Sequence, residues 1–270
     1  MQEVKKQQQT GVGLIEKAFQ VLDLFQLDAP TWSQAEMVRQ TGFNRSTAHR
    51  LVRYLTDTRY LVQSISTGRF ALGPAALDLG RRADAGFDLR GLCLPAMEKI
   101  FASTNESIIL TSLNKMDYTA ICVEQIVGQR GGLRVFEQVG SALKLHAGAA
   151  PKAILASLPD IERNAYLDQD LVKITKHTIT KRDQLVEDLT LTRQRGYSLS
   201  HEETYDGVAG IGAVILDADD YPLGSLAIAL PLQRLTEEKT RSFGLEICSL
   251  ASEITNSLRL SPENKSQATR

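Results

Sequence analysis

The fold of the first domain is decided by the stretch TGFNRSTAHRLVRYL, residues 41–55. Gly42 predicts the end of one helix, because glycine accepts the left-handed turn that other residues resist. Asn44 is a typical N-cap, so a new helix is expected from Arg45 to about Asp57. Four apolar residues recur on it at helical spacing and predict its buried face: Ala48, Leu51, Val52 and Leu55.

Two helices are expected before this one. Ile15, Ala18, Phe19, Leu22 and Phe25 predict one apolar face of a first helix, which ends at Asp28-Ala29-Pro30. Ser33 and Glu36 form the S-x-x-E pattern of a capping box and begin the second helix. Two helices joined by a tight turn with glycine are typical of a helix-turn-helix, whose second helix enters the major groove of DNA.

The charge around this motif favours nucleic acid as the partner. Residues 37–73 hold six arginines and one aspartate, a local charge of +5 in a chain whose net charge is −1. Residues 60–73 predict a hairpin around Ser66-Thr67-Gly68, which is the wing of a winged helix. We expect base-edge contacts from Arg45, Ser46, Thr47 and His49, and phosphate contacts from Arg50, Arg53 and Arg69. A protein-interaction adaptor is the alternative for this module.

The whole chain has the composition of a globular protein. Its 270 residues are 43% hydrophobic and 23% charged, which argues against general disorder. No apolar run approaches the roughly 18 residues of a membrane span, and the polar N-terminus lacks a signal peptide, so no membrane contact is expected. The odd and widely spaced Cys93, Cys122 and Cys248 fit small buried side chains in a reducing cytoplasm.

A second domain follows a short linker helix over residues 74–80, with the boundary near residues 81–88. Its pattern is α+β, with one mostly antiparallel sheet. Strands are expected at 107–114, 118–126, 133–138, 197–203, 207–216 and 223–230. Helices are expected at 89–103, 149–158, 160–168, 181–195 and 236–258.

No catalytic motif is convincing in this domain, and no cofactor is expected. The local cluster His201-Glu202-Glu203 is the basis of one alternative function, a metal-dependent enzyme. Consecutive residues of a strand point to opposite faces, so a polar strand end is the favoured interpretation.

The segment from Leu145 to Lys152, LHAGAAPK, leads from an extended stretch into a helix and is rich in small residues. Backbone N–H groups at a helix N-terminus attract anions, so a small carboxylate effector could bind there. Close packing of the helix against the sheet explains the same composition, and both interpretations stay open.

Three segments in order resemble the IclR-type transcriptional regulators. The first is the winged helix with TGFNRSTAHRLVRYL and GRFALGP, the second LKLHAGAAPKAILA, and the third RGYSLSHEETYDGVAGIGAVILD. The resemblance covers roughly Gly11 to Leu258. It implies a winged helix-turn-helix domain at 11–73, a linker at 74–88 and a GAF/profilin-like effector-binding domain at 89–260. It also implies a homodimer or dimer of dimers on double-stranded operator DNA, controlling catabolic genes in response to a small-molecule effector.

Matching this family residue by residue implies an effector pocket formed by Val135, Leu143, Ala147, Gly148, Ala149, Ser200, Gly210, Ile211, Ala227 and Ala229. This sequence departs from the family pattern at several of these positions. Gly210 stands where cysteine is frequent, Ala227 and Ala229 where some glyoxylate sensors have serine, and Ser200 where aspartate is common. Pro151 replaces the glycine before Lys152. We therefore hypothesise a larger and more apolar cavity, suited to an aromatic or longer aliphatic acid.

Overall fold

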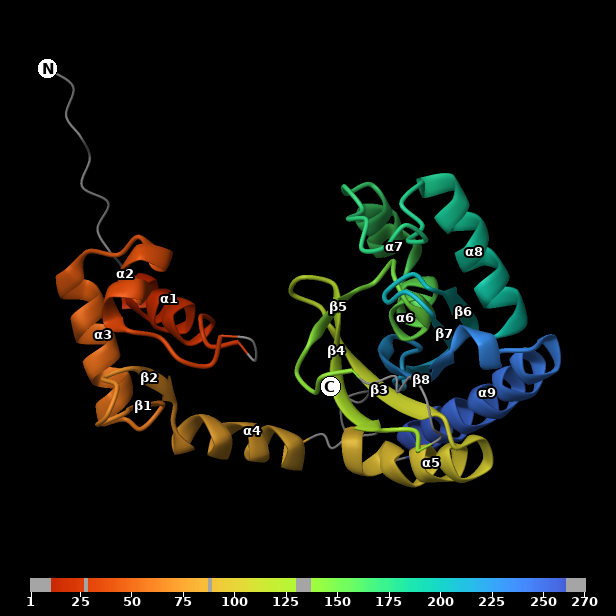
Figure 1. The fold of residues 1–270 in the computed structure, drawn as a ribbon, viewed down its shortest axis with the longest axis horizontal. Coiled ribbons are helices and arrows are strands. Elements are labelled where there is room, and N and C mark those ends of the chain that lie inside the picture. The colour runs from red at the N-terminus through yellow and green to blue at the C-terminus, as the bar shows by residue number, and fades with distance from the viewer. Residues whose placement is uncertain (1–10, 27–28, 87–88, 130–136, 261–270) are drawn as a thin grey trace, which may run out of the picture. The chain divides into compact units, whose positions relative to one another are not determined.

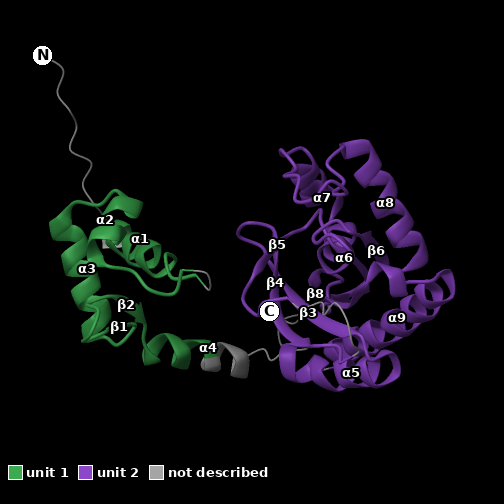
Figure 2. Ribbon diagram, in the orientation of Figure 1, with its two compact units in different colours: residues 1–88 green, residues 89–270 purple. Residues whose placement is uncertain are grey.

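The computed structural model describes residues 11–26, 29–86, 89–129 and 137–260, and confirms an α+β protein with a helix-turn-helix in its N-terminal part. It divides into two compact units, residues 1–88 and residues 89–270 (Figure 1, Figure 2). The change of unit, between residues 88 and 89, falls at the end of the segment 74–88 that was predicted as the linker. None of the described helices is long and apolar enough to cross a membrane.

Among its described residues, unit 1 has three helices and a small hairpin, followed by a fourth helix, α4 Pro74–Gly86. Its elements are α1 Gly11–Leu22, α2 Gln34–Thr41, α3 Arg45–Asp57, β1 Leu61–Gln63 and β2 Phe70–Leu72. The Ser33 side chain caps α2 and forms the predicted capping box with Glu36. Gly42 ends α2 with φ of 70°, and the Asn44 side chain accepts from the N–H of Thr47 at 2.7 Å. These local signals therefore set the helix-turn-helix as predicted.

The apolar face predicted for α1 is partly wrong. Ile15 and Phe19 are each 58% exposed, whereas Val21, which the prediction omitted, is 1% exposed and packs in the core with Phe25. Two overlapping stripes of apolar residues fit the helical period in this segment. The contacts with α3 and with Met37 on α2 select the second stripe, which a count of spacings cannot do.

Two further expectations concern the linker helix and the third strand of the second domain. The helix α4 runs over Pro74–Gly86, longer than the predicted 74–80, since nothing after Pro74 breaks it. The strand expected at 133–138 lies mostly outside the described residues, and Glu137 and Gln138 are not in a strand. The partner of β4 is instead β5, Ala142–Lys144.

Unit 2 contains a six-stranded antiparallel sheet in the order β5-β4-β3-β8-β7-β6. The remaining strands are β3 Ser107–Asn114, β4 Thr119–Ile126, β6 Ser198–His201, β7 Val208–Leu216 and β8 Pro222–Pro231. The helices are α5 Leu89–Thr104, α6 Ala149–Ser157, α7 Asp160–Leu167, α8 Arg182–Arg195 and α9 Glu237–Leu260, with a short 3-10 turn η1 at Leu232–Arg234.

Helices cover both faces of this sheet (Figure 1). The larger core joins α5 and α9 to alternate residues of β7, such as Ile211 and Ile215. On the opposite face α6 packs so closely that a Cβ at Gly212 would lie 2.7 Å from the Ala149 carbonyl. The glycines of β7 therefore let the first turn of α6 lie directly on the sheet.

Candidate DNA-binding surface and effector pocket

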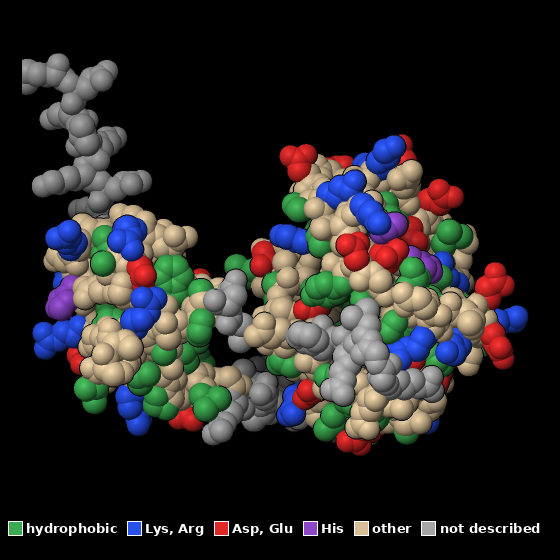
Figure 3. Space-filling model, viewed as in Figure 1, with side chains coloured by type: hydrophobic (Ala, Val, Ile, Leu, Met, Phe, Trp, Pro, Cys, Tyr) green, Lys and Arg blue, Asp and Glu red, His purple; other side chains and the backbone are tan. Residues whose placement is uncertain are grey.

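The outer face of α3 is a basic surface. Arg45, Ser46, His49, Arg50 and Arg53 are exposed, and Thr47 is half-buried. Figure 3 shows Lys and Arg side chains spread over the visible face of unit 1. The apolar residues of α3 are buried on its other side. The helix therefore presents the predicted base-edge and phosphate candidates to solvent, as a reading helix must.

Two neighbours shape this basic surface. The His49 ring nitrogen Nδ1 lies 3.2 Å from the Gln34 side-chain amide, which ties the start of α2 to α3. Arg39 and Arg45 line the same shallow hollow between the two helices. Arg53 forms only a long, exposed pair with Asp57 at 3.8 Å, so its guanidinium is available to a phosphate.

The structure gives Arg69 a task other than the predicted phosphate contact. Its guanidinium lies 2.9 Å from the Glu36 carboxylate and donates to the Thr31 carbonyl oxygen at 2.7 Å. Hydrogen bonds from the Ser33 backbone and hydroxyl, followed by Arg69, lower the pKa of Glu36 to about 2. Arg69 thus fastens the wing to the start of α2, and these bonds compete with the predicted phosphate contact.

The second candidate site is a pocket in unit 2 beside the first turn of α6. Its cavity is about 60 Å³ and its walls are mostly apolar. The predicted residues that line it are Leu143, Gly148, Ala149, Ser200, Gly210, Ala227 and Ala229. They come from β5, the loop before α6, the first residue of α6 and strands β6 to β8. Strands β8, β7 and β6 are neighbours in the sheet, whereas β5 lies at the opposite edge.

Two predicted pocket residues lie elsewhere in the structure. Ile211 alternates with Gly210 along β7, so it points into the core beneath α9, and its assignment to the pocket was wrong. Ala147 is buried in the loop before α6 without lining the cavity. Val135 lies outside the described residues.

Sequence reasoning missed much of the lining. Ile109 from β3 and Val208 from β7 contribute apolar walls, and Glu137, Thr204 and Tyr205 contribute polar ones. Ile109 could have been found, because alternation along β3 places it opposite Ile108 and Leu110. No local pattern marks Glu137 or Tyr205.

One end of the pocket offers hydrogen bonds to an anion. The N–H groups of Ala149 and Ala150 begin α6 and have no hydrogen-bond partner among the described residues. Ser200 is 5% exposed, lines the cavity, and its hydroxyl has no partner in the described part of the chain. A helix N-terminus with unpaired N–H donors and a free hydroxyl suits a carboxylate.

A second polar group in the wall is the carboxylate of Glu137, a residue that is 6% exposed. It accepts from the Ser141 hydroxyl at 2.8 Å and from the Tyr205 hydroxyl at 3.1 Å. Burial, reinforced by the negative charge of Glu137, raises the pKa of Tyr205 to about 12. Tyr205 therefore stays protonated, and its hydroxyl donates a hydrogen bond to Glu137.

A buried ionic cluster holds α6 beside the pocket. Lys152 is fully buried, and its Nζ lies 2.6 Å from Glu203 and 2.8 Å from Asp188. The second oxygen of Glu203 accepts from the N–H of Gly148 at 3.1 Å. Burial raises the pKa of Glu203, although Lys152 and Gly148 favour its charged form. The cluster thereby joins the start of α6 to α8 and to the loop after β6.

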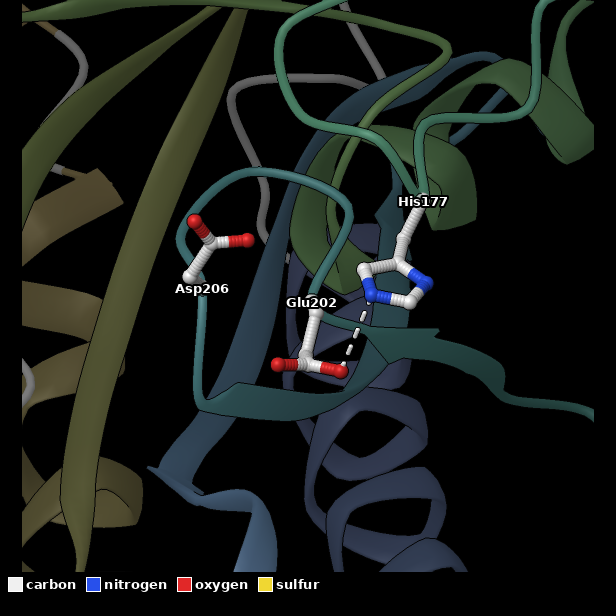
Figure 4. Close-up of side chains that lie close together, drawn as sticks. All are labelled: His177, Glu202 and Asp206. Atoms are coloured by element: carbon white, nitrogen blue, oxygen red, sulfur yellow. Dashed lines mark ion pairs between the residues drawn. The ribbon is translucent and has the colours of Figure 1, made fainter.

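The cluster His201-Glu202-Glu203 does not converge, so the metal site proposed on it is wrong. Glu203 is engaged by Lys152, and His201 is exposed at the end of β6. Glu202 instead lies 3.2 Å from the Nε2 of His177, with Asp206 nearby (Figure 4). These three side chains offer atoms within 4.8 Å of one another, and His177 and Asp206 are exposed. Their arrangement amounts to a surface ion pair with an adjoining carboxylate.

Comparisons with known proteins identify the family to which both parts of the chain are similar. A model of the IclR helix-turn-helix domain matches residues 14–64, and a model of the bacterial transcriptional regulator IclR C-terminal region matches residues 83–256. The regulator KipR of Bacillus subtilis is 31% identical over 224 residues, 83% of this chain and 88% of that protein. The transcriptional repressor IclR of Escherichia coli is 28% identical, covering 82% of this chain and 80% of the repressor.

Solved structures share the fold. A putative IclR regulator from Silicibacter has a TM-score of 0.84 at 22% identity, covering 93% of this chain and 99% of its own. An IclR homologue from Microbacterium hydrocarbonoxydans complexed with 4-hydroxybenzoate has a TM-score of 0.80 at 22% identity, covering 92% and 100%. The matched families and relatives are transcriptional regulators, not enzymes, so the metal-dependent enzyme and the adaptor are set aside. The chain belongs to the IclR family of DNA-binding transcriptional regulators.

Proposed function

We propose that the protein is a ligand-responsive regulator that binds operator DNA through α3 and a small organic acid in the pocket beside α6. The observation that carries the DNA-binding role is the exposed row of Arg45, Arg50 and Arg53 on a helix that follows a tight turn. We infer that the controlled genes are catabolic, since a small organic acid is a carbon source or an intermediate of its breakdown.

The two roles are coupled through differential affinity. A ligand shifts an equilibrium only by as much as it binds one arrangement of the protein better than another. The pocket lies where α6, the loop after β6 and five strands meet, so an acid bound there favours one packing of these elements. The helix α4 joins the two units in sequence and is the segment through which this preference reaches the DNA-binding unit.

The size of the pocket bears on the class of effector. Its apolar walls support an organic acid, as hypothesised from the alanines and glycine at 210, 227 and 229. Its cavity of about 60 Å³ is smaller than the roughly 150 Å³ that accommodates a benzene ring. A short aliphatic acid fits the pocket as it stands, and an aromatic acid requires the pocket to widen.

Calorimetric titration with glyoxylate, butyrate and benzoate tests this choice. We expect butyrate to bind more tightly than glyoxylate, because its methylenes reach the apolar wall. Tight binding of glyoxylate alone would end the hypothesis of a more apolar cavity.

We propose that the active form contains two copies of the chain. A groove on the surface of unit 1 is lined mostly by Leu14, Ile15, Ala18, Leu51 and Tyr54, with Arg50, Arg53 and Asp57 completing its lining. Such a patch on a soluble protein favours association, and two copies would place two α3 helices on half-sites about one turn of DNA apart. Sedimentation equilibrium of Ile15→Glu tests this, with a monomer expected. An unchanged dimer would place the contact elsewhere.

The DNA-binding role is tested by two arginine variants on two duplexes. We expect Arg45→Ala to cost about 1–3 kcal/mol on the operator and little on random DNA. Arg53→Ala should weaken both duplexes alike, because a phosphate contact carries no sequence information. The measurement is fluorescence anisotropy with DNA from upstream of the protein's own gene. Equal losses for both variants on both duplexes would overturn this division of roles.

A further inference from the structure

The pocket contains a buried negative charge that anion binding at α6 does not explain. Glu137 lines the cavity, is 6% exposed, and forms no ion pair with a lysine or arginine among the described residues. Burying a carboxylate without a cation is costly unless hydrogen bonds compensate for the lost water. A carboxylate in the wall of an acid-binding pocket would also repel a second acid group.

The hydrogen bonds of Glu137 leave it with unused capacity. One oxygen, Oε1, accepts from Ser141 at 2.8 Å and from the N–H of Gln138 at 3.3 Å, and shares the Tyr205 hydroxyl. The other, Oε2, accepts from Tyr205 alone at 3.1 Å. A carboxylate offers about four acceptor positions, so Oε2 can take one more donor.

Hydrogen-bond donors, rather than acceptors, lie at the start of α6. There the Ala149 and Ala150 N–H groups and the buried, unpartnered Ser200 hydroxyl favour a carboxylate. The wall of the pocket between these donors and Glu137 is apolar, and its residues include Ile109, Leu143 and Val208. The pocket therefore has a donor-rich region, an apolar wall and one acceptor-only group.

We propose that Glu137 determines effector specificity by selecting carboxylic acids that carry a hydrogen-bond donor, a hydroxyl or an amine, away from the acid group. The ligand carboxylate binds the first turn of α6 and Ser200, and its donor binds Oε2 of Glu137. A plain acid leaves Glu137 without this bond, and a dicarboxylic acid places two negative charges together. The proposal deepens the effector role proposed above and depends on it.

The test compares ligands that share one skeleton. Butyrate, 4-hydroxybutyrate, 4-aminobutyrate and glutarate form the first series; benzoate, 4-hydroxybenzoate, 4-aminobenzoate and terephthalate form a second, for a pocket that widens. Each is titrated by calorimetry into the full-length protein. We expect the hydroxyl or amine member to bind about tenfold or more tightly than the plain acid, and the dicarboxylate to bind most weakly. A preference confined to amines identifies the effector as a zwitterion, and one for hydroxyls as a hydroxy acid.

Variants separate this role from folding. Glu137→Leu should bind butyrate better than 4-hydroxybutyrate, reversing the wild-type order. Glu137→Gln should bind 4-hydroxybutyrate over butyrate by a smaller factor than wild type, because a neutral amide accepts hydrogen bonds more weakly than a carboxylate. It should also gain affinity for glutarate, because the amide does not repel a second carboxylate. Tyr205→Phe removes a competing donor but keeps the charge, so it should retain the wild-type order. Operator binding and the melting temperature of each variant report on its fold.

The outcomes are distinguishable. Equal binding of butyrate and 4-hydroxybutyrate by the wild type, or glutarate binding as tight as either, overturns the role of Glu137 and leaves the effector pocket standing. The same ligand order in Glu137→Leu as in wild type overturns it too. If no acid of either series binds while operator binding is intact, this inference and the effector role both fail, and only the DNA-binding role remains.

Discussion

Replacing Lys152 with methionine should be the most destabilising conservative change near the pocket. The Lys152 ammonium is fully buried within 2.8 Å of two carboxylates, those of Glu203 and Asp188. Methionine preserves most of the aliphatic chain but leaves Glu203 without its cation and Asp188 with the longer pair to Arg195 at 3.8 Å. Breaking a buried pair by removing one partner costs about 3–5 kcal/mol, a large part of the roughly 5–15 kcal/mol that holds a domain folded.

Urea unfolding monitored by circular dichroism measures this cost. The control is Arg182→Met, which removes an ion pair with Asp168 whose side chains are 47% and 66% exposed. Exposed pairs contribute about 0–1 kcal/mol, so this variant should stay within that range of wild type. A double variant, Lys152→Met with Glu203→Leu, should recover part of the loss because a buried charge is then removed with its partner.

The pH dependence provides an independent check. Burial already raises the pKa of Glu203 in the folded protein, and removing Lys152 raises it further. A folded-state pKa above the unfolded value means that the folded protein binds more protons, so stability falls as pH rises through that window. The deficit of Lys152→Met should therefore shrink as the pH is lowered from 7 toward 5. A deficit below 1 kcal/mol, or one independent of pH, would refute the view that Lys152 neutralises buried carboxylates.

Three further predictions follow from local geometry. Gly212→Ala should lower the free energy of unfolding in urea by about 1–3 kcal/mol, since its Cβ would lie 2.7 Å from the Ala149 carbonyl. The control Gly80→Ala has open space around the new Cβ and should lose no stability. Burial lowers the pKa of His146, so unfolding free energy should fall as pH drops below about 6.5, and His146→Gln should abolish that dependence; an equal slope in both proteins would contradict it. Arg69→Ala should leave the salt dependence of operator binding unchanged, and a shallower dependence would place Arg69 among the phosphate contacts.

The DNA-binding unit was predictable because its signals are local. Ser33 with Glu36, Gly42 and Asn44 each set a helix end within four residues, and the structure shows each cap formed. The exposed arginines of α3 then follow from helical period alone. The face of α1 was not predictable in the same way, since Ile15 and Val21 compete for the core and only the contact with α3 decides between them.

The residues of the pocket were predictable only in part, because strand alternation decides which side of the sheet each residue faces. Leu143, Gly148 and Ser200 came from resemblance, whereas Ile211 failed because strand alternation turns it to the other side of the sheet. Glu137 lies in the segment between β4 and β5, and its carboxylate contacts Tyr205, which is 68 positions further along the chain. Long-range pairing of this kind leaves no local pattern in a single sequence.

The most direct test of the central claim is the salt dependence of operator affinity. Each phosphate contact releases counterions, so the logarithm of the association constant should fall linearly with the logarithm of the salt concentration. The double variant Arg50→Ala with Arg53→Ala should reduce that slope by about two units. An affinity that does not vary with salt, or an identical slope in the double variant, would contradict DNA binding through the exposed face of α3.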